Sequence, residues 1–336
     1  MQKMVSLGEV MMRLTATGVQ RIVQATKMDV LYAGAEANVA AALASWGVHS
    51  FHVTRFPDNL IGKAAVAWLK YYGIDTRYVG FGGPRMGLFF VEQGAMARPT
   101  TIVYDRLPSA FSTVDANTFD WEKILDGADW FHWTGITPAL SQGTADALNA
   151  ALEVCARKQI NVSADVNYRS NLWQYGKTPG EIIEPLISKS NYIVSSENDT
   201  RNIFQFGSAK GADDAFVSIS EQLMKRFQSI KAVISSDREQ LSASHNRFSG
   251  KVWDGGQLYM SNRYNLDQIV ERIGTGDAFI AGYIYGEMNG WSKQDSINFG
   301  TAAGVMKHTI EGDTLPCSVP EIQELVKGNT SGRIKR

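Results

Sequence analysis

Short runs of β character alternate with longer helical runs along most of this 336-residue chain. The predicted strands are Met4–Leu7, Phe51–Phe56, Trp130–Thr134, Ile160–Val166, Tyr192–Ser195 and Ala232–Ser235. The predicted helices are Glu36–Trp46, Leu60–Tyr72, Thr144–Arg157, Gly180–Ser188, Asp213–Phe227 and two more after Gly276. Because strands that alternate with helices of this length are typical of βαβ units, we expect an α/β fold: a mostly parallel sheet with helices on both faces.

Two segments, Met12–Tyr32 and Gly87–Ser112, interrupt this rhythm with apolar and polar residues that alternate without a helical pattern. We expect them to form a small β-sheet that projects from the core as a lid. A third β-rich stretch, Gln240–Ser261, predicts one or two hairpins. The expected organisation is a main domain of residues 1–11, 33–86 and 113–328, a lid of residues 12–32 and 87–112, and a frayed tail of residues 329–336.

The composition excludes several classes of protein. Lys and Arg number 33 against 34 Asp and Glu, so the net charge of −1 lacks the basic footprint of a nucleic-acid binder. Glu9 and Arg13 occur where a signal peptide would be apolar, and no apolar run approaches the roughly 20 residues that span a bilayer. Cys155 and Cys317 form no CxxC pair, which favours a reducing compartment. We therefore expect a soluble, cytoplasmic protein without nucleic-acid or membrane partners.

The segment Glu271–Gly282 contains the strongest chemical signal in the chain. Gly274, Thr275 and Gly276 precede an apolar helix that begins near Asp277. Small residues at this place let backbone N–H groups point into a concavity at the helix N-terminus, where the helix dipole favours negative charge. Asp277 either caps the helix or acts as a general base beside this anion site, and the spacing alone leaves both roles open. Since the chain has no Walker A motif, a nucleotide would need another cradle.

Several motifs together resemble those of the PfkB (ribokinase-like) sugar kinases. The stretch Gly274–Gly282 is similar to the C-terminal signature of that family, and Gly34–Ala40 resembles its sugar-binding turn. Pro57–Gly62 and Gly73–Thr76 resemble two further landmarks, and the resemblance runs from Gly8 to Pro320. It implies a ribokinase-like fold and an ATP-dependent kinase that uses Mg²⁺. Related kinases pair their lids across a two-fold axis, and a small isolated sheet cannot bury one face by itself, so we expect a homodimer or a larger assembly.

Within that family, the chain is most similar to the 2-keto-3-deoxygluconate kinases, in the motifs Gly8-Glu9, Arg13-Leu14, Tyr104–Arg106, Asp165–Arg169 and Leu172-Trp173. The resemblance therefore implies a sugar-acid substrate that is phosphorylated on its terminal hydroxyl. A fructokinase- or ribokinase-type kinase for a neutral sugar is the alternative within the same class. A catalytically silent sugar- or nucleotide-binding protein on the same scaffold is the alternative outside it.

The resemblance also assigns roles by matching position. It makes Asp277 the base that removes the proton from the sugar hydroxyl, and Gly274, Thr275 and Gly276 the hole that stabilises the transferred phosphoryl group. The guanidinium groups of Arg106 and Arg169 would bind the sugar carboxylate, which a neutral sugar lacks. The other implied contacts are Gly34, Asn38, Phe89 and Tyr104 for the sugar, Ser196, Ser235, Gly274, Gly276 and Ala303 for the nucleotide, and Asp199 for Mg²⁺.

Three positions depart from the family pattern. Glu271 stands where the C-terminal signature usually opens with Asp, and the bulky Arg272 follows it. The Asn-x-x-Glu motif, which organises Mg²⁺ and phosphates through water, appears here as Ser196–Asp199. The glycines usual in the nucleotide loop are replaced by Ser235–Glu239. These departures affect the metal and ATP contacts more than the phosphoryl-transfer centre.

The histidines offer no competing chemistry. His49 and His52 are three residues apart in a predicted strand, so we expect them to face opposite sides of the sheet. His132 lies between two aromatic residues and is expected in the core. His245 follows no nucleophile elbow, so a hydrolase triad has little support.

Overall fold

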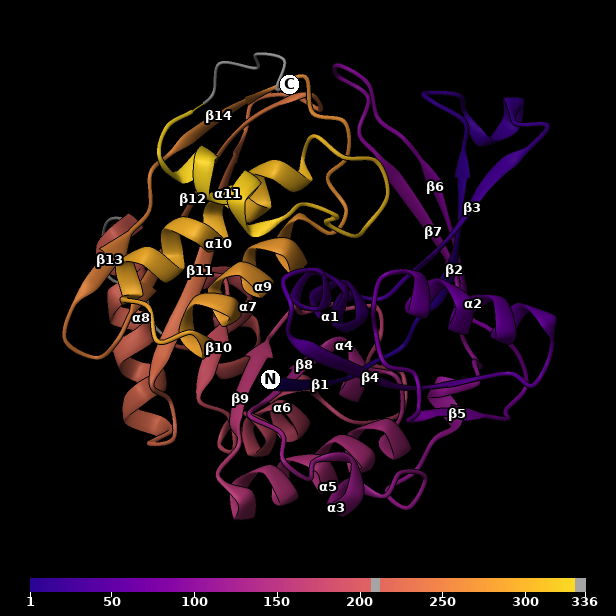
Figure 1. The fold of residues 1–336 in the computed structure, drawn as a ribbon, viewed down its shortest axis with the longest axis horizontal. Helices are drawn as coiled ribbons and strands as arrows, with labels where there is room; N and C mark the ends of the chain where they lie inside the picture. Colours follow the sequence, from indigo (N-terminus) through magenta and orange to yellow (C-terminus); the bar gives the residue numbers. More distant parts are fainter. Residues whose placement is uncertain (207–211, 330–336) are drawn as a thin grey trace.

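A long, mostly parallel sheet forms the centre of the molecule in the computed structural model, which describes residues 1–206 and 212–329. Its strands are β1 (Lys3–Leu7), β4 (His49–Phe56), β5 (Val79–Phe81), β8 (Trp130–Thr134), β9 (Asn161–Asp165), β10 (Tyr192–Val194), β11 (Ala232–Gln240), β12 (His245–Trp253), β13 (Leu258–Met260) and β14 (Tyr264–Asp267). They follow the order β13-β12-β11-β10-β9-β8-β1-β4-β5, and β14 also pairs with β12 (Figure 1). All pairs from β5 to β11 are parallel, whereas β12 pairs antiparallel with each of its neighbours.

Helices cover both faces of this sheet, as the sequence predicts. They are α1 (Ala35–Ser45), α2 (Leu60–Tyr71), α3 (Trp121–Ile124), α4 (Ile136–Ala139), α5 (Gln142–Lys158), α6 (Pro179–Ile187), α7 (Glu197–Phe204), α8 (Ala212–Arg226), α9 (Thr275–Met288), α10 (Lys293–Lys307) and α11 (Val319–Val326), with 3₁₀ turns at Ile22–Gln24 and Phe111–Thr113. Successive side chains of a strand point to opposite faces. Met4 of β1 accordingly packs in one core with α1, α9 and α10, and Val5 packs in a second core with α5, α6 and α8.

A separate four-stranded sheet projects from this body (Figure 1, indigo to purple at the upper right). It consists of β2 (Met11–Ala16), β3 (Met28–Ala33), β6 (Leu88–Glu92) and β7 (Thr101–Asp105), in the order β3-β2-β6-β7. Strands β2 and β6 are parallel, and the two outer pairs are antiparallel. The two interrupting segments of the sequence therefore form one small sheet, which we call the lid.

The two faces of the lid differ in what they meet. On one face, Met11, Phe89 and Tyr104 line the large cavity described below. On the other face, the strand registers align Val30, Leu14, Phe90 and Val103 in one row across all four strands. Val30 is 52% exposed and Val103 is 51% exposed. The lid thus covers a cavity with one face and presents an apolar row to the outside with the other.

Strand β11 is longer than the sequence predicts. This strand was expected to end at Ser235, but it continues to Gln240 because each residue from Ser235 onward pairs with β12. Ser235–Glu239 is therefore strand and not the nucleotide loop that the family pattern implies. The predicted hairpins of Gln240–Ser261 contain β12 and β13. The stretch Ser235–Gln240 is polar and was expected to form a loop. It lies beyond the residues of β11 that pair with β10, and backbone pairing with β12 holds it as a strand.

The histidines, the search for a membrane span and the C-terminal tail were three further expectations from the sequence. His49 is half-exposed, whereas His52 and His132 are buried, and their Nδ1 atoms lie 2.8 Å from the hydroxyls of Ser6 and Ser163. Across residues 1–206 and 212–329, no helix is long and apolar enough to cross a membrane. Residues 330–336 of the expected frayed tail lie outside the described residues.

Candidate active site

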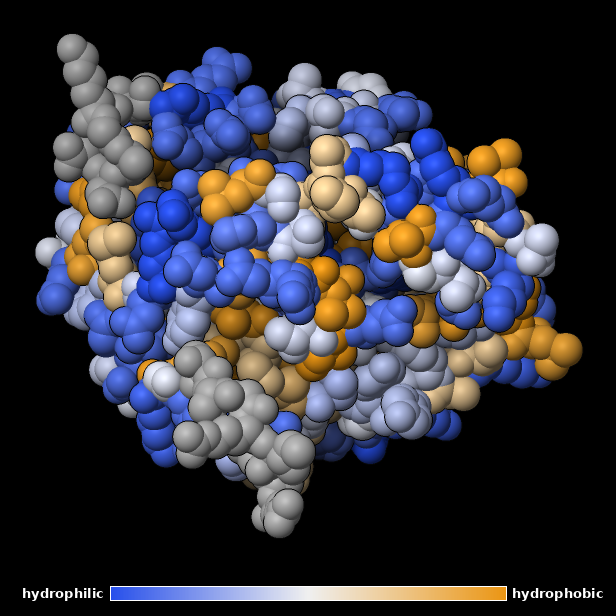
Figure 2. Space-filling view, turned by 90° about the horizontal axis from the view of Figure 1, so that it is seen from above, coloured by the Kyte–Doolittle hydropathy of each residue, from blue (hydrophilic) through white to orange (hydrophobic). Residues whose placement is uncertain are grey.

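A cavity of about 410 Å³ lies between the lid and the carboxyl ends of the central strands. Glu9 follows β1, Asp165 ends β9, and both line it, together with residues of the lid. Seen from above, the molecular surface is hollowed near its middle, between the main body and the lid end at the right (Figure 2). Ligands of open α/β sheets bind at this edge of the sheet. The cavity is therefore the candidate active site.

Asp277, in the first turn of α9, is held by an asparagine from another helix. The Nδ2 of Asn38 in α1 donates a hydrogen bond to Oδ2 of Asp277 over 2.7 Å, and both residues line the cavity. Burial raises the pKa of Asp277 to about 7, and the nearby carboxylates of Asp313 and Glu36 also raise it, whereas Asn38 and Arg169 lower it. A carboxyl group with a pKa near neutrality suits a general base that works at physiological pH.

The residues before Asp277 leave their backbone open to the cavity. Gly274 has a φ of +81°, and a Cβ there would lie 1.9 Å from the carbonyl oxygen of Asp313, so only glycine fits. At Gly276, a Cβ would have no neighbour within 4 Å. The Thr275 hydroxyl is engaged internally, because it donates to the carbonyl of Arg272 over 2.9 Å. The first N–H groups of α9 have no partner within the helix and can therefore receive an anion.

Arg106 and Arg169 both line the cavity but differ in their surroundings. Arg106 follows β7 and is buried, and its Nε donates to Oε2 of Glu9 over 2.5 Å. Ser109 donates to the other oxygen of the same carboxylate. Arg169 is exposed in the loop after β9, and its Nη1 donates to the carbonyl of Tyr168 over 3.2 Å. Glu9 therefore anchors Arg106 to the main body, and Arg169 is the less constrained of the two cations.

Two further carboxylates, Asp165 and Asp199, line the cavity near Asp277. Burial, followed by the charges of Asp277 and Asp199, raises the pKa of Asp165 to about 8. Burial also raises the pKa of Asp199. Among residues 1–206 and 212–329, no group of three or more ligating side chains forms a metal cage. Mg²⁺ usually keeps several waters and binds through one or two carboxylates and substrate phosphates, so Asp165 and Asp199 fit such an ion.

The other residues expected at the sugar also lie at the cavity. Gly34 precedes α1, where a Cβ would lie 2.2 Å from the carbonyl oxygen of Glu9, so this glycine is also required by packing. Phe89 is buried in β6, and its ring centroid lies 5.9 Å from that of Tyr104 in β7. Tyr104 is about half exposed. Both aromatic residues therefore contribute to the wall that the lid provides.

The structure does not bring three of the expected nucleotide residues to this cavity. Ser196 caps α7, and its hydroxyl accepts a hydrogen bond from the backbone N–H of Asp199 over 3.0 Å. Ser235 is buried in β11. Ala303 of α10 is buried against α9, where a Cβ on Gly282 would lie 3.2 Å from its own Cβ. Of the two end residues of the Ser196–Asp199 motif, Asp199 lines the cavity and Ser196 does not.

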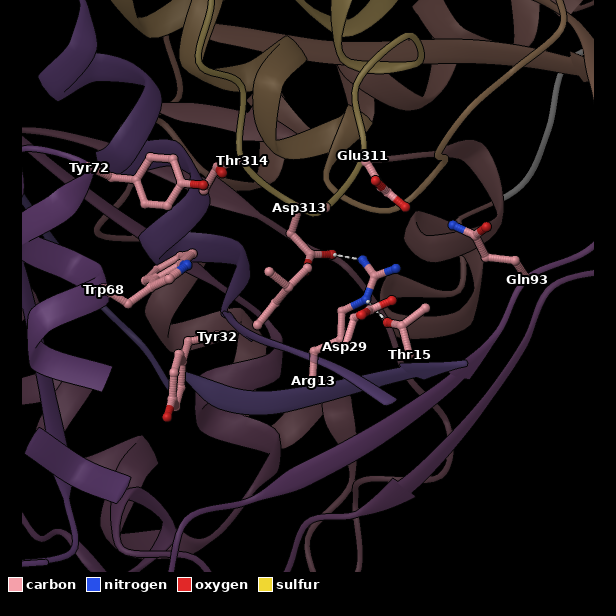
Figure 3. A pocket seen from close by; sticks show the side chains of 12 residues that line it. Arg13, Thr15, Asp29, Tyr32, Trp68, Tyr72, Gln93, Glu311, Asp313 and Thr314 are labelled. Carbon is pink, nitrogen blue, oxygen red and sulfur yellow. Dashed lines mark hydrogen bonds and ion pairs between the residues drawn. The ribbon is translucent and has the colours of Figure 1, made fainter. Parts of the chain in front are cut away.

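A buried arginine connects the lid to the loops around this site. Arg13 of β2 donates to Oε2 of Glu271 over 2.5 Å and to Oδ1 of Asp313 over 2.9 Å. A second cavity, of about 200 Å³, adjoins this cluster, and Figure 3 shows Trp68 and Tyr72 on the side opposite Arg13. Asp313 lines both cavities. Glu271, which stands where the family pattern has Asp, thus forms an ion pair with Arg13 of the lid.

Several residues that line the cavity had no role predicted from the sequence. Glu9 and Asp165 belong to motifs shared with the 2-keto-3-deoxygluconate kinases, but these motifs alone indicate no role for either carboxylate. Arg238 and Arg272 had been noted only as departures from the family pattern, yet both line the cavity. Asp313 belongs to no recognisable motif, and its sequence context offered no signal.

Comparisons with known proteins show the family of this chain. The model of the pfkB family carbohydrate kinases matches residues 1–320. A 2-dehydro-3-deoxygalactonokinase of Haloferax volcanii is 27% identical over 330 residues, which cover 98% of each chain. The crystal structure of a 2-dehydro-3-deoxygluconokinase from Thermotoga maritima is 40% identical, with a TM-score of 0.94 over 98% of this chain and 100% of that one. A PfkB family carbohydrate kinase from Listeria grayi is 30% identical, with a TM-score of 0.91 over 97% and 100% of the two chains. This chain therefore belongs to the pfkB family of carbohydrate kinases.

Proposed function

We propose that this kinase transfers the γ-phosphoryl group of ATP, in the presence of Mg²⁺, to the terminal hydroxyl of a 2-keto-3-deoxy sugar acid. 2-Keto-3-deoxygluconate is the preferred candidate, and its C4 epimer 2-keto-3-deoxygalactonate is the nearest competitor. Similarity to a 2-dehydro-3-deoxygluconokinase and to a 2-dehydro-3-deoxygalactonokinase supports both. The observation that carries the proposal is a base, an open helix N-terminus and two arginines that line one cavity.

Asp277 takes the proton from the sugar hydroxyl as that oxygen attacks phosphorus. Its raised pKa means that it remains a good proton acceptor near neutral pH. The hydrogen bond from Asn38 fixes the direction of the carboxylate, which leaves the other oxygen for the substrate. Little covalent chemistry is required beyond this step, because phosphoryl transfer depends mainly on positioning and electrostatic stabilisation.

The N-terminus of α9 stabilises the charge on the transferred group. The backbone N–H groups beside Gly276 lie where no protein atom would meet a Cβ, so a phosphoryl oxygen can approach closely. Asp199 and Asp165 would hold Mg²⁺, directly or through water. When bound, this ion neutralises charge on the phosphates of ATP.

The carboxylate of the sugar acid is recognised by Arg106 and Arg169. A carboxylate that leaves water for a closing cavity needs cationic donors, and a guanidinium group supplies two parallel hydrogen bonds. Glu9 takes the Nε of Arg106 and so leaves its terminal nitrogens for a ligand. A neutral sugar has no carboxylate for either arginine to pair with, and this argues against the fructokinase- or ribokinase-type alternative.

ADP release in a coupled assay tests the proposal. The substrates are the two epimeric sugar acids, fructose and ribose, and Asp277→Asn is the inactive control. We expect a kcat/KM for one or both acids at least about 30-fold above that for either neutral sugar, which corresponds to about 2 kcal/mol. A preference for fructose or ribose would favour the neutral-sugar alternative. Binding of ATP and sugar without turnover would favour the catalytically silent alternative.

The assembly and location belong to the same proposal. The row Val30, Leu14, Phe90 and Val103 gives the outer face of the lid an apolar character that supports a homodimer formed through the lid, or a larger assembly of such dimers. Cys155 and Cys317 are free and buried thiols, which supports a reducing, cytoplasmic location.

A further inference from the structure

Three arginines of the active-site cavity form no ion pair among residues 1–206 and 212–329, namely Arg169, Arg238 and Arg272. The last two lie beside the N-terminus of α9. Arg238 in β11 and Arg272 before α9 both line the cavity. Arg238 donates to the hydroxyl of Thr275, and Arg272 donates to the carbonyl of Ser242 over 2.5 Å and to Oδ1 of Asn246 over 3.2 Å. All three acceptors are neutral. By contrast, Arg106 of the same cavity and Arg13 of the adjoining cavity are paired with carboxylates.

The two guanidinium groups are held in place on the same side of the cavity. The Arg238 guanidinium group donates to the hydroxyl of Thr275, which in turn donates to the backbone carbonyl of Arg272. The Arg272 guanidinium group is held by its own hydrogen bonds to Ser242 and Asn246. The guanidinium carbon of Arg238 also lies 5.8 Å from the ring centroid of Phe248. Such restraints reduce the entropy lost when an arginine binds a ligand.

The charge on this side of the cavity is uncompensated. Burial, followed by the charge of Arg272, lowers the pKa of Arg238 to about 10, and burial lowers the pKa of Arg272. Both groups therefore stay positive at neutral pH and repel one another. The Nε of Arg272 is buried and has no hydrogen-bond partner within the part of the chain that the structure describes. An anion with several oxygens would relieve the repulsion and satisfy these donors.

The surroundings of the two arginines indicate that this anion is a chain of phosphates. Arg238 and Arg272 flank the N-terminus of α9, which itself favours phosphate, whereas Arg106 and Arg169 come from the lid and from the loop after β9. We propose that Arg238 and Arg272 bind the terminal phosphates of the nucleotide, in place of the glycine-rich loop that this chain lacks. This assignment rests on the proposed function, since it takes the nucleotide to be the phosphoryl donor.

Nucleotide binding measured by calorimetry tests the assignment without turnover. The probes are ADP, AMP and 2-keto-3-deoxygluconate, each added to the wild type, Arg238→Gln and Arg272→Gln. We expect either substitution to weaken ADP binding roughly 10- to 100-fold, which is the loss of about one charge-assisted hydrogen bond. AMP, which has a single phosphate, should lose much less, and the sugar acid should bind as before. Arg247→Gln is the matched control, because Arg247 of β12 pairs with Glu239 of β11 and is not among the residues that line this cavity.

Each other outcome has a definite meaning. ADP binding that is unchanged in both variants overturns the role of the arginines and leaves ATP dependence intact. Equal losses for ADP and AMP, or a loss confined to the sugar acid, overturn the assignment to the terminal phosphates. A wild type that does not bind ADP overturns the assignment together with the proposed donor. If Arg272→Gln does not fold, Arg238→Gln decides the question, and Arg238→Lys is expected to retain more of the affinity than Arg238→Gln.

Discussion

The Nδ2 of Asn38 in α1 lies 2.7 Å from Oδ2 of Asp277 in α9 and donates a hydrogen bond to it. These residues are 239 positions apart in the sequence, and they connect the sugar-binding turn with the proposed catalytic base. The bond fixes one carboxylate oxygen and stabilises the ionised form of Asp277. It therefore affects both the position and the pKa of the base.

Replacement of Asp277 by Asn should abolish most turnover. The new amide oxygen can still accept the hydrogen bond from Asn38, so the shape of the site is retained while the proton acceptor is lost. We expect kcat to fall by about 100-fold or more, with little change in sugar-acid affinity. Steady-state kinetics and calorimetry measure the two effects. The exposed Asp267→Asn serves as the control, and near-normal turnover in Asp277→Asn would show that another group is the base.

The pH dependence should report the same carboxyl group. Because burial raises the pKa of Asp277 to about 7, activity should fall as the pH decreases through that value and the base becomes protonated. Asn38→Ala removes a hydrogen bond that lowers this pKa, so the acidic limb of kcat/KM should move to higher pH. If the acidic limb stays in place or moves to lower pH, the hydrogen bond from Asn38 does not control the pH dependence of activity.

Arg13→Met should destabilise the fold, because Glu271 and Asp313 would lose their shared cation in a buried place. Removal of one partner from a buried ion pair costs about 3–5 kcal/mol. Urea unfolding at pH 8 measures the loss, which should shrink at lower pH as Asp313, whose pKa is raised by burial, becomes protonated. The surface variant Arg247→Met should lose no more than about 1 kcal/mol. Equal stabilities of the two variants would mean that the buried cluster contributes little.

The lid should determine the assembly state. We expect a dimer, or a multiple of dimers, by light scattering at micromolar concentration. Charges placed in the outer row, as in the double variant Val30→Lys and Val103→Lys, should yield monomers, because two desolvated ammonium groups would lie in the interface. Leu60→Lys, an exposed position on α2, should leave the assembly unchanged. A monomeric wild type would contradict this proposal.

Local patterns in the sequence were sufficient for most of the fold. The alternation of strands and helices predicted the parallel sheet, and two segments of alternating polarity predicted the lid sheet. The small residues from Gly274 to Gly276 likewise indicated the open helix N-terminus. Each of these features depends on residues close together in the chain, where periodicity and backbone preference are informative.

Contacts between distant residues could not be predicted in this way. Arg13 meets Asp313 across 300 positions, and no local pattern indicates that pair. Arg238 reaches the cavity only because β11 extends beyond its buried half, and polar side chains had made that extension read as a loop. The pairing of Arg106 with Glu9 depends on how the lid joins the main body. Such contacts require the tertiary arrangement.

The central claim is that this kinase recognises a sugar acid through its carboxylate. The most direct test is the ratio of kcat/KM for 2-keto-3-deoxygluconate to that for fructose or ribose, in the wild type and in Arg169→Ala. Loss of one cationic donor should reduce kcat/KM for the acid by roughly 30- to 1000-fold, or about 2–4 kcal/mol. The neutral sugars should be comparatively spared, and Arg157→Ala, on the surface of α5, should change neither. A ratio that falls steeply in Arg169→Ala is the predicted result; an unchanged ratio, or a wild type that prefers the neutral sugar, would contradict the account.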